Sequence, residues 1–197
     1  MPTVFSHAIV ALTLGKAAGV ERRALVWGAG LAMLPDADVL ALPFDAGFGG
    51  LFGHRGLTHS LAFAGVAAAL AAAALRNAQL PGGSGRRLFC YLFAAIALHG
   101  LFDAMTDGGS GIAFFAPFSS ARYFLPWRPI EVSPLGAGFF STRGAEVILN
   151  EALWIGLPCA AALAVKYALS HALSRSAARA ETDASAHRHR TDTSQDT

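Results

Sequence analysis

Five apolar stretches, interrupted by ionisable side chains at only a few points, limit what this chain can fold into. They cover residues 4–18, 24–44, 60–75, 88–105 and 147–169. A helix that crosses a bilayer needs about 20 apolar residues, within a range of roughly 17 to 25. The last three stretches are the best candidates, whereas the first is short and the second contains two aspartates. We expect an all-α, multi-pass membrane helical bundle with about four or five transmembrane helices.

The shortage of charge points the same way. Hydrophobic residues make up 54% of the 197 residues, and charged residues only 14%. Soluble domains usually carry about 25% charged residues, so the composition predicts a small integral membrane protein whose main partner is membrane lipid. The net charge is only +2, which gives no basic field for nucleic acid, and no nucleic-acid partner is expected. The sequence leaves the oligomeric state open.

The remaining segments differ in character. Residues 106–143 are rich in Gly, Pro and aromatic side chains, which predicts a long irregular loop. From Ser174 onward the chain is polar and has no apolar period. We therefore expect a membrane-embedded domain over residues 1–173 and a polar, disordered tail over residues 174–197.

The distribution of Lys and Arg predicts an orientation in the membrane. If all five stretches cross, one side carries nine of these residues as far as Arg179, namely Lys16, Arg22, Arg23, Arg76, Arg86, Arg87, Lys166, Arg175 and Arg179. The other side carries four, namely Arg55, Arg122, Arg128 and Arg143. Because the more basic side of a membrane protein faces the cytoplasm, we expect the N-terminus outside and the C-terminal tail in the cytoplasm.

Histidines and aspartates gather at the ends of the apolar stretches, where membrane segments normally avoid ionisable groups unless these pair, bind a ligand or line a cavity. They lie in the motifs SHA, LPDAD, HRGLTHS and HGLFDAMTD. All of them fall on the predicted outer side of the membrane. The candidate metal ligands are His7, Asp36, Asp38, His54, His59, His99, Asp103 and Asp107.

The spacing of these residues has a chemical meaning. His99 and Asp103 are four residues apart, so a helix presents both side chains on one face. Imidazole nitrogens and carboxylate oxygens are ligands of zinc, and a catalytic zinc site keeps one position for water. Carboxylates gathered so closely would repel one another without a cation. We expect one or two divalent metal ions, of the zinc type.

Several of these residues also have simpler interpretations. His7 can be a core histidine, Asp36 can form an ion pair with Arg55, and Asp38 has a similar alternative. Asp107 precedes two glycines and can merely set a turn. The other four candidates, His54, His59, His99 and Asp103, lie in two separate motifs, and four such hydrogen-bonding groups need a shared partner.

The motifs SHA, LPDAD, HRGLTHS and HGLFDAMTDGG, followed by FFAPFSSARYFLPWRPIEVSP, resemble the YdjM-like family of membrane-bound, metal-dependent hydrolases over roughly residues 3–155. The resemblance implies a bacterial inner (cytoplasmic) membrane location and a hydrolase fold. More distantly, the chain is similar to the zinc-dependent phospholipase C and single-strand nuclease superfamily, whose His-x-x-x-Asp pair is matched by His99 and Asp103. The chain lacks the N-terminal Trp that ligates metal in that superfamily, which favours one or two ions over three.

The resulting expectation is a membrane-bound, metal-dependent hydrolase that cleaves a phosphoester or lipid-linked substrate with a metal-activated water. Arg55 would stabilise the developing negative charge, and Glu151, or else Glu146, would act as general base. The metal cluster would lie near the outer face of the membrane. Two alternatives stay open: a metal or proton transporter or sensor, and a structural membrane protein in which a metal pins the helices.

Overall fold

The protein's structure, a computed structural model, describes residues 1–44, 50–77, 85–134 and 136–193. Within these residues it is all-helical with no strand, as the sequence predicts. The elements are α1 (Val4–Ala18), α2 (Arg22–Met33), the 3₁₀-helices η1 (Leu34–Phe44), η2 (Leu57–His59) and η3 (Gly136–Phe140), α3 (Leu61–Asn77), α4 (Gly85–Ala104), α5 (Thr142–Glu151), the π-helical turn η4 (Ala152–Gly156) and α6 (Leu157–Thr193). The chain divides into two compact units, Met1–Ala160 and Ala161–Thr197.

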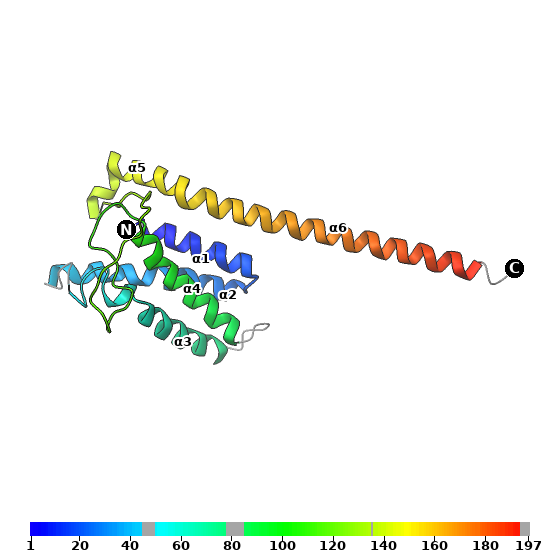
Figure 1. Ribbon diagram of the computed structural model, residues 1–197, viewed down its shortest axis with the longest axis horizontal. Helices are drawn as coiled ribbons and strands as arrows, with labels where there is room; N and C mark the ends of the chain where they lie inside the picture. Colours follow the sequence, from blue (N-terminus) through cyan, green and yellow to red (C-terminus); the bar gives the residue numbers. More distant parts are fainter. Residues whose placement is uncertain (45–49, 78–84, 135, 194–197) are drawn as a thin grey trace. The chain divides into compact units, whose positions relative to one another are not determined.

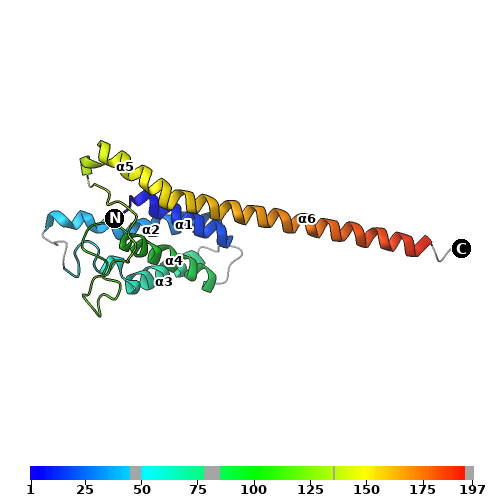
Figure 2. The same ribbon diagram turned by 45° about the horizontal axis from the view of Figure 1, so that its top comes forward.

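In the first unit, α4 packs against α1, α2 and α3 (Figures 1 and 2). Helices α1 and α3 run away from the end where the N-terminus lies, and α2 and α4 run back towards it. The turn between α1 and α2 depends on Gly19, whose φ of 65° lies in the left-handed region that glycine adopts readily. Its backbone N–H donates to the carbonyls of Gly15 and Lys16, which ends α1 and reverses the chain.

Small side chains let these helices approach closely. Alanines, among them Ala24, Ala64 and Ala68, are buried with Leu92 and Ile96 in the core between α2, α3 and α4. Small residues at helix contacts are typical of packing in lipid, where close backbone approach replaces hydrophobic burial as the source of stability. Small and apolar side chains thus form the core between α2, α3 and α4.

Tyr91 of α4 reaches between α1 and α2. Its hydroxyl donates to the carbonyl of Ala11 at 3.2 Å, and its ring occupies the space that a Cβ atom on Gly15 or Gly28 would need. These two positions therefore need glycine because the Tyr91 ring lies where a Cβ atom would be, and not because the backbone has a positive φ.

We expect Gly28→Ala to destabilise the bundle by about 1–3 kcal/mol, the usual cost of overpacking a close contact. The matched control is Gly30→Ala on the same helix, where a Cβ would meet no atom within 4 Å. Because alanine favours a helix over glycine, that control should be neutral or stabilising by up to about 1 kcal/mol. Unfolding by SDS in mixed micelles measures both free energies, and equal effects of the two substitutions would contradict the packing described above.

Two helical segments are long and apolar enough to cross a membrane, Gly85–Ala104 and Thr142–Ala177, and Val4–Ala18 and Leu61–Arg76 are shorter apolar helices. The predicted count of four or five crossings stays a prediction. The apolar stretch 24–44 is not one regular helix, because α2 ends at Met33 and η1 follows. Pro35 gives the physical reason, since its ring lacks an N–H and clashes with the preceding turn of an α-helix.

The sequence predicts two irregular regions, a long loop and a C-terminal tail, and the structure agrees with that prediction only for the loop. Residues 105–134 form the expected long loop, held by isolated bridges that pair Thr106 with Ile130 and Ile112 with Tyr123. The tail differs from the prediction, because α6 continues to Thr193 where the sequence predicts disorder from Ser174. The tail is rich in Ala and Arg, which favour helix even without an apolar face.

Candidate metal centre

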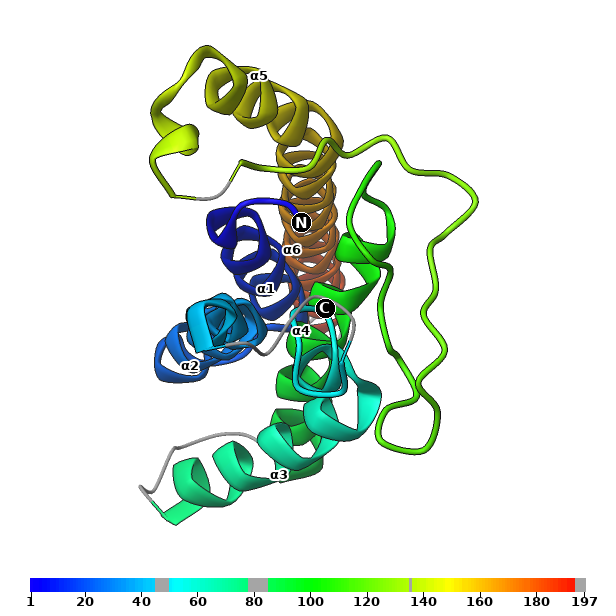
Figure 3. The same cartoon turned by 90° about the vertical axis from the view of Figure 1, so that its left-hand side faces the viewer.

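Four helical segments each deliver side chains to one end of the bundle, the end that Figure 3 faces. His7 lies near the start of α1, Asp36 lies in η1 just after α2, and His59 ends η2. His99 and Asp103 occupy the last turns of α4, the helix that contacts the other three. None of these five residues is more than 4% exposed. We call them the His/Asp cluster.

His59 ends η2, and α3 begins two residues later at Leu61. The Ser60 hydroxyl accepts a hydrogen bond from the backbone N–H of Phe63 at 3.0 Å and so caps the start of α3. The ring of His59, just before this capped helix start, lies beside His99 and Asp103 of α4.

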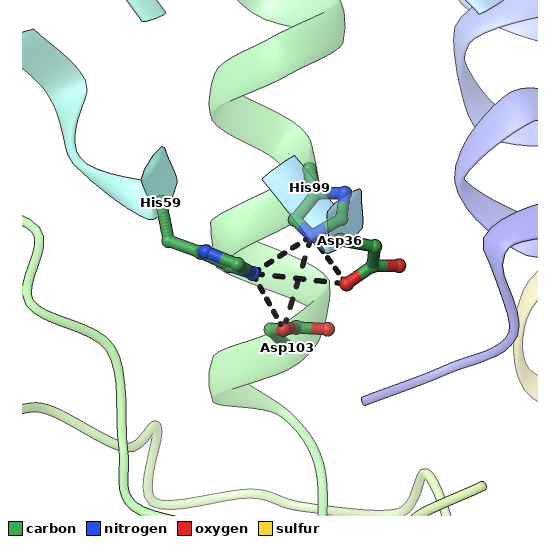
Figure 4. Close-up of side chains that lie close together, drawn as sticks. All are labelled: Asp36, His59, His99 and Asp103. Carbon is green, nitrogen blue, oxygen red and sulfur yellow. Dashed lines mark hydrogen bonds and ion pairs between the residues drawn. The ribbon is translucent and has the colours of Figure 1, made fainter. Parts of the chain in front are cut away.

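Four members of the cluster place their ligand atoms within 4.8 Å of one another (Figure 4). His99 Nε2 lies 3.3 Å from Asp36 Oδ1, and His59 Nε2 lies 3.4 Å from Asp103 Oδ2. The two Nε2 atoms are 3.1 Å apart. Two imidazole nitrogens and two carboxylate oxygens are a ligand set that suits a tetrahedral zinc-type ion.

Hydrogen bonds on the far side of each ring fix which nitrogen faces the cluster. His99 Nδ1 donates to the carbonyl of Ala32 at 2.7 Å. His59 Nδ1 lies 3.0 Å from the hydroxyl of Thr58 and 3.3 Å from Asp38 Oδ2, and that hydroxyl donates its own proton to Asp38. Both rings thus carry their proton on Nδ1, which leaves the Nε2 lone pair for a metal, the usual arrangement of a ligating histidine.

Several buried atoms of the cluster lack hydrogen-bond partners among the described residues. They are both carboxylate oxygens of Asp36, both of Asp103, and His7 Nε2. Buried polar atoms almost always have partners, and a buried charge without one is costly. Metal ions are the usual partners of buried carboxylates and imidazoles left in this way, so the residues present fit a divalent metal.

The electrostatics of His59 agree with a cation site. Burial alone would lower the pKa of this ring, but the carboxylates of Asp103, Asp36 and Asp38 together raise it to about 10. The surroundings of His59 therefore attract positive charge strongly.

Asp38 and His54, both predicted ligands, lie beside the cluster in a group with His59. His54 Nδ1 lies 2.6 Å from Asp38 Oδ1. Asp38 also accepts hydrogen bonds from Thr58 and from the backbone N–H of Arg55. Asp38 thus orients two histidine rings. Thr58 is not among the predicted site residues, although its position next to His59 is a usable signal.

Arg55 is fully buried and lies against the cluster. Its Nε is 3.5 Å from Asp103 Oδ2, so it pairs with that residue and not with Asp36, the alternative that the sequence left open. The guanidinium also donates to the Gly108 carbonyl at 2.8 Å and to the Thr106 hydroxyl at 3.0 Å. Its φ of 64° is rare outside glycine, which indicates a backbone held in place by these contacts.

A pocket of about 90 Å³ adjoins this arginine. Residues from the loops and the chain start line it, namely Met1, His54, Arg55, Gly109, Ser110, Val132 and Ser133. Two of these residues also touch carboxylates described above, since Arg55 contacts Asp103 and His54 contacts Asp38. The pocket therefore lies next to the groups that surround the candidate metal position.

The structure leaves two predicted site residues outside the cluster. Asp107 is exposed and accepts a hydrogen bond from the backbone N–H of Val132 at 2.9 Å, so it shapes the loop, as the simpler interpretation held. Glu151, the expected general base, is buried, but its oxygens accept hydrogen bonds from the N–H and hydroxyl of Thr3, both at 2.6 Å, and from the Ser6 hydroxyl. It joins η4 and α5 to the first turn of α1, which carries His7.

We expect Glu151→Gln to lower the free energy of unfolding by about 1.5–3 kcal/mol, the contribution of hydrogen bonds to a charged group. The matched control is Glu146→Gln in the same helix, an exposed residue whose partner is Arg143. An exposed pair contributes about 0–1 kcal/mol. Thermal unfolding in detergent compares the two variants, and an unchanged Glu151→Gln protein would show that the Glu151 contacts do not hold α1.

The fold and the cluster together define a class: a small helical membrane protein with a buried His/Asp centre that can hold a metal ion. Comparison with known proteins then identifies the family. The family model described as YdjM inner membrane protein matches residues 1–174, and the chain belongs to this family, as its motifs indicated.

A relative supports this assignment. The chain is 41% identical over 170 residues to the inner membrane protein YbcI of Escherichia coli (strain K12), an alignment that covers 80% of this chain and 92% of the relative. No solved structure matches significantly. The predicted inner membrane location is confirmed, whereas the side on which the cluster and the tail lie stays a prediction.

Proposed function

We propose that this protein is a membrane-bound hydrolase that uses a divalent metal to cleave a phosphoester in a lipid or lipid-linked substrate. The observation that carries the proposal is the pocket beside the cluster. Arg55 and His54 line this pocket and also contact Asp103 and Asp38. A metal that only pinned helices together would need no such adjoining space.

The residues that would hold the metal are Asp36, His59, His99 and Asp103, with His7 close by. A divalent ion there supplies Lewis-acid polarisation and an activated water at neutral pH. Arg55 contributes a permanent positive charge beside the same position, which suits a phosphoryl group.

His54 has the features of a proton-transfer group. Its Nδ1 is held at 2.6 Å from Asp38, which orients the ring as carboxylates orient catalytic histidines. Hydrolysis consumes one water: its oxygen bonds to phosphorus, the ester P–O bond breaks, and a proton reaches the departing oxygen. We assign that proton transfer to His54, which lines the pocket.

The transporter alternative has less support in the fold. An ion pathway needs polar groups at several depths in the membrane. The His/Asp cluster lies at one end of the bundle, and the described core between α2, α3 and α4 consists of apolar residues and Tyr91. We therefore favour chemistry at one face over passage through the bundle.

The distribution of basic residues supports a site that faces the outside of the membrane. Six basic residues lie at or near the helix ends opposite the cluster, namely Lys16, Arg22, Arg23, Arg76, Arg86 and Arg87. Basic residues favour the cytoplasmic side. We propose that the cluster faces the outside of the inner membrane and that the chain crosses it four or five times.

The test uses full-length protein in detergent, stripped with a chelator and then supplied with zinc or manganese. The probes are bis-p-nitrophenyl phosphate, p-nitrophenyl phosphate and vesicles of phosphatidylglycerol followed by phosphorus NMR. We expect metal-dependent hydrolysis that His54→Ala reduces strongly and that the exposed-residue control His171→Ala leaves unchanged. No hydrolysis of any probe by metal-replete, folded protein would overturn the proposal.

A further inference from the structure

The two cluster carboxylates each face two different sets of histidines. Asp36 turns Oδ1 towards His99 Nε2, at 3.3 Å, and Oδ2 towards His7 Nε2, at 3.9 Å. Asp103 repeats the pattern, with Oδ2 at 3.4 Å from His59 Nε2 and Oδ1 at 3.5 Å from His7 Nε2. Each carboxylate therefore has one oxygen on the side of His59 and His99 and its other oxygen on the side of His7.

The His7 side has the same unsatisfied character as the other side. His7 Nε2, Asp36 Oδ2 and Asp103 Oδ1 are buried, and within the described part of the chain none has a hydrogen-bond partner. The side chains of the three residues are 1%, 2% and 0% exposed. A single ion between His59 and His99 would leave these three atoms without a partner.

The position of His7 is fixed from two directions. Its ring stacks on that of His99, with centroids 3.7 Å apart. The helix turn that carries it is held by Glu151 through Thr3 and Ser6. A histidine fixed in this way is prearranged as a ligand, because little freedom is lost when it binds.

We infer that the cluster is a dinuclear centre in which Asp36 and Asp103 both bridge two divalent ions. One ion takes His59 and His99 and has four protein ligands, whereas the second takes His7 and has three. Four ligands are typical of a closed structural site, and three leave the open position of a catalytic one. The inference rests on the proposed metal-dependent function and assigns the second, open position to the His7 side.

Charge gives this centre a preferred ligand. The carboxylates of Asp36, Asp38 and Asp103 and the guanidinium of Arg55 together carry about −2 when ionised. Two divalent ions would leave the centre positive by about two charges, which favours an anionic ligand such as a phosphate group. The dinuclear centre thus favours an anionic substrate, which agrees with the phosphoester of the proposed function.

The experiment is a manganese titration of full-length, tag-free protein in detergent. Mass spectrometry measures bound metal per chain, and electron paramagnetic resonance separates a single Mn²⁺ from a pair coupled through bridging carboxylates. We expect about two ions per chain and a coupled signal. His7→Gln should retain about one ion with the uncoupled single-ion signal, and His171→Gln should match the unchanged protein.

Each other outcome has a defined meaning. One uncoupled ion in the unchanged protein, with His7→Gln indistinguishable from it, would overturn the dinuclear centre and leave a mononuclear metal site standing. No bound metal in any folded variant would overturn the proposed function as well. Circular dichroism and the melting temperature of His7→Gln verify that a lost ion is not a lost fold, and His7→Asn repeats the test with a shorter side chain.

Discussion

Replacing His99 and Asp103 together by alanine should remove bound metal from the protein almost completely. The unchanged protein, purified gently without chelators, should carry at least about one divalent ion per chain. The double variant loses one nitrogen ligand and one carboxylate from the same helix face, and the remaining groups cannot close a coordination shell. Mass spectrometry of detergent-purified protein measures metal content directly.

The control for this experiment is Asp107→Ala. Asp107 follows Asp103 by one helical turn in the sequence, but it is exposed and bonds to the backbone of Val132. We expect this variant to keep its metal. If the double variant retained as much metal as the unchanged protein while Asp107→Ala lost it, the cluster would not be the metal site.

Replacing Arg55 by alanine should give the largest loss of stability of any single substitution considered for this protein, about 3–5 kcal/mol. Removal of the guanidinium takes the ion-pair partner from the buried carboxylate of Asp103 and the hydrogen-bond donor from the Gly108 carbonyl and the Thr106 hydroxyl. SDS unfolding in mixed micelles measures the loss. Metal supplied in excess should recover part of it, because an ion also compensates the charge of Asp103.

Two further variants separate the effects of charge, geometry and burial on the stability loss of Arg55→Ala. Arg55→Lys keeps the positive charge but not the planar fork that reaches three acceptors, so we expect an intermediate loss. Arg128 is exposed and stacks on the ring of Phe124, with 5.0 Å to the centroid. Arg128→Ala should cost only about 0.5–1 kcal/mol. Similar losses for Arg55→Ala and Arg128→Ala would show that burial of Arg55 contributes nothing.

Sequence spacing predicted well the parts of the site that depend on one helix. His99 and Asp103 share a face of α4 because a helix places residues four apart side by side. The structure also brings together His7, Asp36 and His59, which the sequence could only group by residue type. Their convergence depends on α4 contacting three other helices at once, and no local pattern encodes that contact.

Two predicted site residues, Glu151 and Asp107, lie outside the cluster for a common reason. Both are carboxylates, like Asp36 and Asp103 of the cluster, and both lie near apolar stretches of the sequence. In the structure their oxygens accept hydrogen bonds from Thr3, Ser6 and Val132. A carboxylate is available to a metal only if no nearby N–H or O–H group binds it first, and those donors come from distant parts of the chain.

The amino-acid sequence by itself determined the class of protein, the apolar helices and the residue types of the His/Asp cluster. Low charge, apolar length and the clustering of His and Asp are local properties, so they can be read without a fold. Only the tertiary structure decided which atoms face one another. It separated the two oxygens of Asp36 and of Asp103 between His7 and the pair of His59 and His99. The physical reason is that ligand geometry depends on how helices cross and how each ring is hydrogen-bonded, which are properties of packing between segments distant in sequence.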